Sequence, residues 1–330
     1  MGSWRYEPHG LLPSGRRGVR PYGWPGVTDG LPVVPPTPER VAEMLAAGGV
    51  SGETILGEVP TRDVLVTAEK VAINAVMAGC LPEYFPVVLA AVRAFLQPKA
   101  NAHSTTATLA GAAHAVIVNG PIRHDIGVHG GQACFGPGFR PNATIGRALR
   151  LVIRNVCRTV PGVLDRASFS WPLRYSFCFA EDEEATGWTP LHVKLGYERE
   201  QSVVTIQSIM RLFQVTEFAP ESEEILTTAY EIARHMGLQR DEWAGDGRSV
   251  VLVIGPEHYR RLVADGWTKE SIAEWLYPRL VADTAGKFDQ KVTLASPDNI
   301  WVVTAGGPGI AQSWWFIPHL ATPTHERILR

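Results

Sequence analysis

The strongest constraint on the fold is a set of landmarks that occurs twice along the chain. Each set runs from an apolar triplet through a glutamate, a glycine and a second glutamate to another apolar run and a Gly-Pro turn. The sets span residues 64–121 and 251–308, with nearly equal spacing between landmarks. Because apolar triplets are typical of buried strands and early acidic residues of helix starts, each set predicts strand, helix, helix and strand. The landmarks are Val64, Glu69, Gly79, Glu83 and Pro121 in the first set, and Val251, Glu257, Gly266, Glu270 and Pro308 in the second.

This duplication predicts an α/β or α+β fold with two pseudo-equivalent halves, residues 37–123 and 248–330. Residues 124–247 form a large glycine-rich insertion that we expect to close over a cleft between the halves. Residues 1–36 are rich in proline and aromatic side chains, and they predict an extended surface arm because proline lacks an N–H donor and has a fixed φ. The alternative is that strand–helix–helix–strand is simply a common string in chains of this class.

Charge and composition exclude several classes of partner. Lysine and arginine number 31 and aspartate and glutamate 33, so the chain lacks the basic surplus that nucleic-acid binding needs. No run approaches the ~20 apolar residues of a membrane helix, and the first residues lack the apolar core of a signal peptide. The four cysteines show no CxxC or disulfide-framework spacing. We therefore expect a cytoplasmic protein with neither nucleic acid nor a membrane as its partner.

Two glycine loops that follow predicted strands are the first candidates for ligand binding. Asn119, Gly120 and Arg123 lie in one loop, and Gly306 and Gly307 lie in the other. Open α/β sheets bind ligands at strand ends, and an arginine fork matches a carboxylate or a phosphate. If the repeat is real, the loops face each other across one cleft; otherwise they are ordinary tight turns. Neither a Walker A loop nor a GxGxxG fingerprint is present, which disfavours a nucleotide cofactor.

Cys80 and Glu83 are the candidate catalytic residues. Cys80 follows the helix-ending Gly79 and precedes Pro82, so it lies at or beside the start of the next helix. The positive end of a helix lowers the pKa of a thiol, as a nucleophile requires, and Glu83 in the same turn is placed to act as an acid or base. The alternative is a buried, inert thiol, and both interpretations are also open for Cys134 in its glycine-rich loop.

A third candidate binding element runs from the glycine-rich stretch 135–141 into a helix. Asn142 opens this helix, and Arg147 lies about one turn further on. Free N–H groups at a helix start, together with an arginine, suit a small carboxylate; plain capping with a solvated arginine is the alternative. No cofactor is predicted. His124 and His129 in the preceding loop are the weaker candidates for a metal site, because the sequence fixes no third ligand.

Two further patches have simpler interpretations. The acidic run 181–184 predicts a solvated loop rather than a cation site. The aromatic run 314–316 and the N-terminal arm predict an interface with a second copy or another subunit, because aromatic side chains are enriched at interfaces. We therefore expect a homo-oligomer or a hetero-complex.

Three segments of the chain resemble those of a bacterial protein family that is labelled uncharacterised. They are GLPVVPPT at 30–37, EKVAINAVMAGC at 69–80, and the stretch 135–147. The resemblance covers most of the chain. Because the family has no established activity, the resemblance implies no catalytic residue.

Together these residues predict an enzyme that acts on a small polar or anionic molecule by cysteine or acid–base chemistry, of the hydrolase or lyase/isomerase type. Two alternatives stay open: a non-catalytic or partner-dependent subunit of a larger complex, and a metalloenzyme that uses the histidine-containing loop. We expect the site between 119–123 and 305–309, with Cys80 on one wall and the helix start at 142–147 on another.

Overall fold

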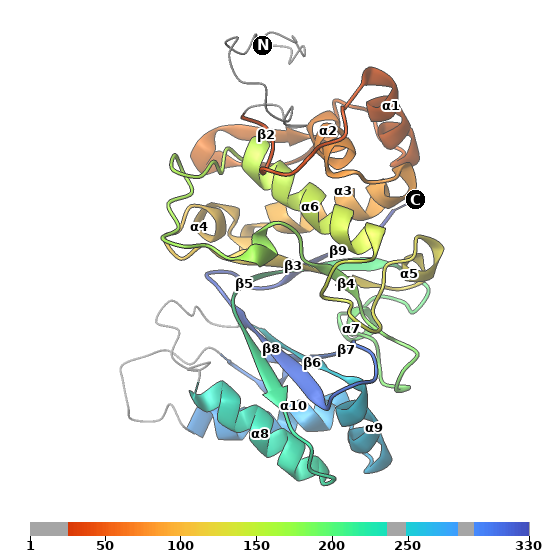
Figure 1. Ribbon diagram of the computed structural model, residues 1–330, viewed down its shortest axis with the longest axis vertical. Helices are drawn as coiled ribbons and strands as arrows, with labels where there is room; N and C mark the ends of the chain where they lie inside the picture. Colours follow the sequence, from red (N-terminus) through yellow and green to blue (C-terminus); the bar gives the residue numbers. More distant parts are fainter. Residues whose placement is uncertain (1–25, 236–248, 283–293, 330) are drawn as a thin grey trace, which may run out of the picture.

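The computed structural model describes residues 26–235, 249–282 and 294–329 (Figure 1). Most of the predicted arm therefore lies outside the described residues. The helices are α1 (Pro38–Ala47), α2 (Ala68–Ala78), α3 (Phe85–Leu96), α4 (Ala102–Thr106), α5 (Ile122–Asp125), α6 (Arg140–Asn155), α7 (Leu191–Lys194), α8 (Ser222–His235), α9 (Pro256–Ala264) and α10 (Lys269–Ala282). The strands are β1 (Ile55–Val59), β2 (Val64–Thr67), β3 (Ala113–Asn119), β4 (Cys178–Ala180), β5 (Val203–Thr216), β6 (Val250–Ile254), β7 (Ile300–Thr304), β8 (Gln312–Pro318) and β9 (Thr324–Arg327).

A seven-stranded mixed sheet forms the centre of the molecule, so the predicted α/β or α+β class is confirmed. Its order is β4-β3-β5-β8-β6-β7, and β9 also pairs with β5. The β3–β4 and β6–β7 pairs are parallel, whereas β5 pairs antiparallel with all its neighbours. The 14-residue β5 joins the two ends of the sheet. Its first part pairs with β3 and β9 and its second part with β8, with a register shift between Ile209 and Arg211.

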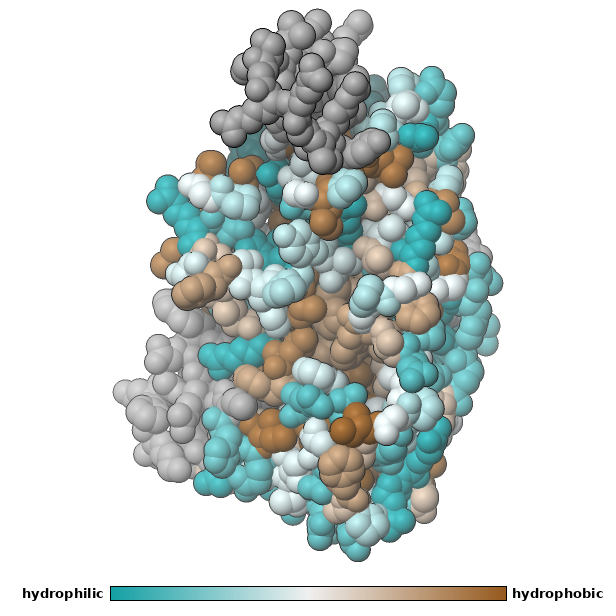
Figure 2. Space-filling view, viewed as in Figure 1, coloured by the Kyte–Doolittle hydropathy of each residue, from teal (hydrophilic) through white to brown (hydrophobic). Residues whose placement is uncertain are grey.

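The sheet curves so that its two ends share one inner core. Along β3, Val116 and Val118 pack with α2, α3 and α6, whereas Ile117 faces a cluster that also contains Val251 and Val253 of β6. Alternation of this kind buries both faces of a strand, which explains why β3 and β6 are apolar throughout. Helices cover the outer faces, α2, α3 and α6 at one end and α8–α10 at the other (Figure 1). In the same view, hydrophobic residues lie at the middle of the face, between these two layers (Figure 2).

Several helix ends follow the sequence signals. Thr37 caps α1 by accepting a hydrogen bond from the amide of Arg40, and proline occupies the first helical position. Gly79 ends α2 with φ at 90°, a left-handed conformation that glycine adopts without steric cost. Among the described helices, none combines the length and the apolar character needed to cross a bilayer.

The first strands of the two sets of landmarks lie in different sheets. β2 pairs with β1 in a separate two-stranded sheet, whereas its proposed counterpart β6 lies beside β7 in the large sheet. The segment 124–247, expected to close over a cleft, supplies α6, β4, β5 and α8 to the body of the fold. The second segment has the order strand, helix, helix, strand, and the first has the same order with the short α4 added before its last strand. Their equivalence as a repeat stays a prediction.

Candidate functional site

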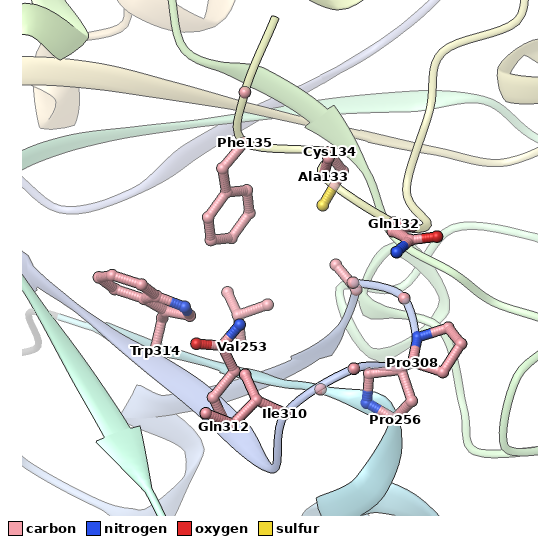
Figure 3. A pocket seen from close by; sticks show the side chains of 16 residues that line it. Gln132, Ala133, Cys134, Phe135, Val253, Pro256, Pro308, Ile310, Gln312 and Trp314 are labelled. Carbon is pink, nitrogen blue, oxygen red and sulfur yellow. The ribbon is translucent and has the colours of Figure 1, made fainter. Parts of the chain in front are cut away.

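A cavity of about 350 Å³ lies at the C-terminal ends of the parallel strands β6 and β7 (Figure 3). Two glycine-rich loops form its walls: residues 132–136 between α5 and α6, and residues 305–310 between β7 and β8. The end of β6 and the side chains of Gln312 and Trp314 on β8 complete the lining. This volume lies within the range of small-molecule sites, and strand ends are where α/β sheets place them.

Cys134 is the cysteine that lines this cavity. Its sulfur points from the 132–136 loop into the space between Phe135 and the 305–310 loop (Figure 3). The preceding residue, Ala133, has φ at 61°, which is uncommon for a residue with a Cβ atom. The chain therefore turns sharply just before the cysteine.

Asn142, predicted to bind a substrate, holds the Cys134 loop, and its role in substrate binding stays a prediction. Its buried amide donates to the carbonyl oxygens of His129, at 2.9 Å, and Cys134, at 3.3 Å. Its Oδ1 accepts from the amide of His129 at 2.8 Å. Because α6 begins at Arg140, these three bonds tie the loop to a helix that is packed in the core.

Gly306 and Gly307 bring the second loop against the first. Gly306 has φ at 101°, and its amide donates to the carbonyl of Gly130 at 2.8 Å. At Gly307, a Cβ atom would overlap Gln132, lying 2.5 Å from its Cα and 2.8 Å from its backbone nitrogen. Only glycine allows so close an approach of the two backbones. Both predicted glycines therefore belong to the cavity wall.

The electrostatics of the cavity keep the Cys134 thiol protonated at neutral pH. Burial raises its pKa to about 12, and the Asp182 carboxylate adds to that rise. Hydrogen bonds from the backbone of Gly306 and of the Cys134–Phe135 turn act in the opposite direction, because they favour the thiolate. Burial, followed by the charge of Glu184, raises the pKa of Asp182 as well.

Arg123, predicted to bind an anionic substrate, is fully engaged within the chain. Its guanidinium binds Glu184 at 2.8 Å and Glu183 at 3.1 Å, and it donates to the carbonyl of Glu181 at 2.9 Å. Its Nε donates to the carbonyl of Gly120 at 2.9 Å. This cation is therefore paired with carboxylates of the protein's own acidic run.

Asn119 and Gly120 face the same acidic run. Asn119 donates to Glu181 at 2.6 Å and to Glu183 at 3.0 Å, and the amide of Gly120 donates to Glu183 at 2.7 Å. Glu181 is 0 % exposed and also forms an ion pair with Lys269. The prediction of a solvated acidic loop is therefore wrong: the run is largely drawn into the fold, because its carboxylates satisfy buried donors.

The strand ends that precede the two predicted ligand loops, 119–123 and 305–309, both contact the acidic run 181–184. The amide of Glu181 donates to Val118 at the end of β3, and the amide of Asp182 donates to Thr304 at the end of β7. The cavity, however, lies on the side of the second loop, and residues 119–123 do not line it.

Arg147 binds the N-terminal segment rather than an open site. Its guanidinium makes two 2.8 Å bonds to the Asp29 carboxylate and donates to the carbonyl of Pro32 at 2.9 Å. Burial of Asp29 opposes ionisation, but the hydrogen bond and charge of Arg147 outweigh it and lower the pKa of that carboxyl. The predicted substrate arginine therefore fastens residues 29–32 to α6.

Cys80 lies in the core between α2 and α6. Its thiol donates to the carbonyl of Thr144 at 3.3 Å, and burial raises its pKa to about 12. The predicted lowering of this pKa is wrong, because desolvation outweighs the hydrogen bond to Thr144 and the charges of Arg140 and Arg147. Glu83 lies on the exposed surface.

The two histidines proposed for a metal have other partners. His124 Nε2 lies 3.1 Å from a carboxylate oxygen of Glu184, and His129 Nε2 lies 2.9 Å from the carbonyl of Gln132. The His129 ring also stacks on Phe139 at a centroid distance of 3.7 Å. Within residues 26–235, 249–282 and 294–329, no group of three or more His, Cys, Asp or Glu side chains is arranged to hold a metal.

The aromatic run 314–316 is part of β8 rather than a surface patch. Trp315 and Phe316 are fully buried, and Trp314 lines the cavity. The interpretation of this run as an interface is therefore wrong for Trp315 and Phe316, and the expected oligomer or complex stays a prediction. Gln312 and Trp314 were missed as site residues. Side chains two residues apart on a strand share a face, which would have grouped them, but the polarity of residues 312–318 does not alternate and so did not indicate a strand.

Comparisons with protein-family models, with curated proteins and with solved structures found no match to this chain.

Proposed function

We propose that the chain is an enzyme that acts on a small molecule through the thiol of Cys134, with hydrolase or lyase chemistry. The observation that carries this proposal is the position of the thiol, which faces a cavity of about 350 Å³ between two glycine-rich loops. Cys80, by contrast, directs its sulfur to the Thr144 carbonyl inside the α2–α6 packing. The proposal keeps the predicted class of chemistry and moves the nucleophile to another cysteine.

The groups around Cys134 are suited to nucleophilic addition. The thiol must lose its proton as it attacks, and we take Asp182, whose charge acts on the Cys134 pKa and whose own pKa is raised, as the candidate base that accepts it. Of the backbone N–H groups that favour the thiolate, those of Gly306 and Cys134 also donate to the carbonyls of Gly130 and Gly131. The N–H of Phe135 is the kind of donor that stabilises an oxyanion formed from a carbonyl.

One observation favours a second candidate, a binding subunit without catalysis. A thiol pKa of about 12 leaves Cys134 unionised at neutral pH, as in an inert core cysteine. In that case the cavity binds a small molecule, and any reaction takes place on a partner protein.

The two candidates are separated by incubating the purified chain with a panel of small esters, amides and unsaturated carbonyl compounds. Turnover is followed by mass spectrometry of the small molecules, and covalent adducts by the mass of the intact protein. We expect turnover or an adduct in the wild type and in Cys80→Ala, and neither in Cys134→Ala. Turnover that persists in Cys134→Ala contradicts the proposal. Reversible binding without turnover or adduct in all three proteins supports the binding subunit.

A further inference from the structure

The lining of the cavity carries almost no charge. Sixteen described residues line it, and the Cys134 thiol is the one titratable side chain among them. The titratable side chains next to this lining include two carboxylates and His129, whose Nε2 lies 2.9 Å from the carbonyl of Gln132. Asp182 acts on the Cys134 thiol, and Glu257 accepts the amide of Gly309 at 2.8 Å on the other wall. The N-terminus of α9, at Gly255 and Pro256, adds the positive end of a helix dipole to the lining, and Glu257 in its first turn offsets it. The side-chain charge around the cavity is therefore neutral to negative.

The cations expected at the site are bound to carboxylates elsewhere. Arg123 pairs with Glu183 and Glu184, and Arg147 pairs with Asp29. A carboxylate or phosphate that entered the cavity would lose hydration without gaining a cation, and it would be repelled by Asp182. An anionic ligand is thus disfavoured on both counts.

The lining does offer neutral hydrogen bonds and apolar contacts. Gln214 Nε2 donates to Gln312 Oε1 at 2.6 Å, which leaves the amide NH₂ of Gln312 as a donor for a ligand. The rings of Phe135 and Trp314 stand at 71° to each other with centroids 6.3 Å apart, and Ile310 adds an aliphatic surface. A donor beside aromatic walls fits a ligand with an acceptor oxygen and an apolar body.

We propose that the cavity selects uncharged small molecules that carry a carbonyl-type acceptor and that it excludes carboxylates and phosphates. This inference rests on the proposed function, because it takes the cavity at Cys134 to be the reactive site. It also narrows the predicted substrate class, polar or anionic, to the uncharged part of that range.

Iodoacetamide and iodoacetate test the selection, because they are nearly equal in size and differ in charge. With either reagent the Cys134 sulfur forms a bond to the CH₂ carbon, the C–I bond breaks, iodide leaves with the bonding pair, and the thiol proton passes to the buffer. The two rates at Cys134 are measured by peptide mass spectrometry. We expect the ratio of the amide rate to the acid rate to be at least ~10-fold larger in the native chain than in the urea-unfolded chain.

A matched pair of variants tests the electrostatic cause. Ile310→Lys adds a cation to the cavity wall, and we expect it to reduce the native ratio at least ~5-fold by attracting iodoacetate. Val163→Lys adds the same charge at an exposed site outside the lining, and it should leave the ratio unchanged. A native ratio equal to the unfolded one, or equal effects of the two lysines, overturns the proposal.

If the proposed function is wrong, the alkylation experiment gives a different result. If neither reagent modifies Cys134 under conditions that label the unfolded chain, Cys134 is not the reactive group. The charge selection is then decided with benzamide and benzoate, whose binding to Cys134→Ala is compared by saturation-transfer NMR. In Cys134→Ala we expect saturation transfer to benzamide and none to benzoate. When Ile310→Lys is added to that variant, we expect transfer to benzoate as well. Equal transfer to both ligands without that lysine overturns the selection.

Discussion

Cys80 and Cys134 are almost equally buried, at 6 % and 4 % exposure, yet their sulfur atoms have different surroundings. The Cys80 sulfur is directed at the Thr144 carbonyl within the packing of two helices, whereas the Cys134 sulfur is directed into a cavity. Exposure therefore does not distinguish the two thiols on which the sequence prediction and our proposal rest. The space next to the sulfur does, because a substrate needs room in which to approach it.

The raised pKa of Cys134 predicts how its reactivity depends on pH. The thiolate is the nucleophile, and below a pKa of about 12 its population increases tenfold for each pH unit. We therefore expect the rate of alkylation by iodoacetamide at Cys134 to increase about tenfold per unit between pH 7 and pH 10, without a plateau. Peptide mass spectrometry over this range measures it. A plateau near pH 8–9, the range of an ordinary thiol, would show that burial does not control this group.

Replacing Arg147 is expected to change stability rather than ligand binding. Arg147→Ala leaves the Asp29 carboxylate without its two bonds, at a cost of about 1–3 kcal/mol. The folded pKa of Asp29 is lowered, so this contribution is present above the unfolded pKa and is lost as the pH falls through the folded one. Urea unfolding at pH 7 and pH 3 should therefore show a smaller difference between variant and wild type at pH 3. A difference in unfolding free energy that does not change with pH would show that the Asp29 carboxylate does not depend on Arg147.

At the scale of elements, the cavity is formed by the close approach of two loops, residues 132–136 and residues 305–310. Gly307→Ala places a Cβ atom against the backbone of Gln132, so the loops must separate, and we expect a loss of about 1–3 kcal/mol in the free energy of unfolding. Gly309→Ala on the same loop is the control, because no atom lies within 4 Å of its Cβ position. We expect it to stay within about 0.5 kcal/mol of the wild type. Equal costs for the two substitutions would mean that the loops do not touch in solution.

Elements whose apolar pattern is continuous were predictable from the sequence. Strands β3, β6 and β7 are buried on both faces and follow runs of Val, Ile and Leu, and the starts of α1 and α9 carry proline at the first position. Strands β8 and β9 were not predicted. β8 contains three consecutive aromatic residues without alternation of polarity, and β9 is four residues long and mostly polar. Both segments pair with β5, which is far from them in the sequence, and this pairing makes them strands.

The candidate site was predictable only in part. Glycines 306 and 307 were identified because glycine and proline after a strand have a local structural meaning. The partners of Arg123 and Arg147 were not, because a carboxylate far away in the sequence takes each guanidinium, Glu184 in one case and Asp29 in the other. Sequence spacing shows that a cation is near a loop. It does not show which anion the fold brings to it.

At the scale of the whole molecule, a buried ion pair links the two ends of the sheet. Lys269 at the start of α10 pairs with Glu181, which follows β4 at the opposite edge from β7, and both side chains are buried. Lys269→Met leaves the Glu181 carboxylate buried without its cation, and we expect a cost of about 3–5 kcal/mol in urea unfolding. Lys99→Met, at an exposed lysine, should cost less than about 0.5 kcal/mol. A cost below about 1 kcal/mol for Lys269→Met would show that Glu181 does not depend on this partner.

The central claim is that the cavity at Cys134 is the reactive site of the chain, and the order in which the four cysteines are modified tests it most directly. The native protein is treated with limiting iodoacetamide at pH 8, and the labelled peptides are counted by mass spectrometry over time. The account predicts that Cys134 is labelled before Cys80, Cys157 and Cys178, because its sulfur alone among the four lines the cavity. Labelling of Cys80 first, or of all four cysteines at one common rate, would contradict it.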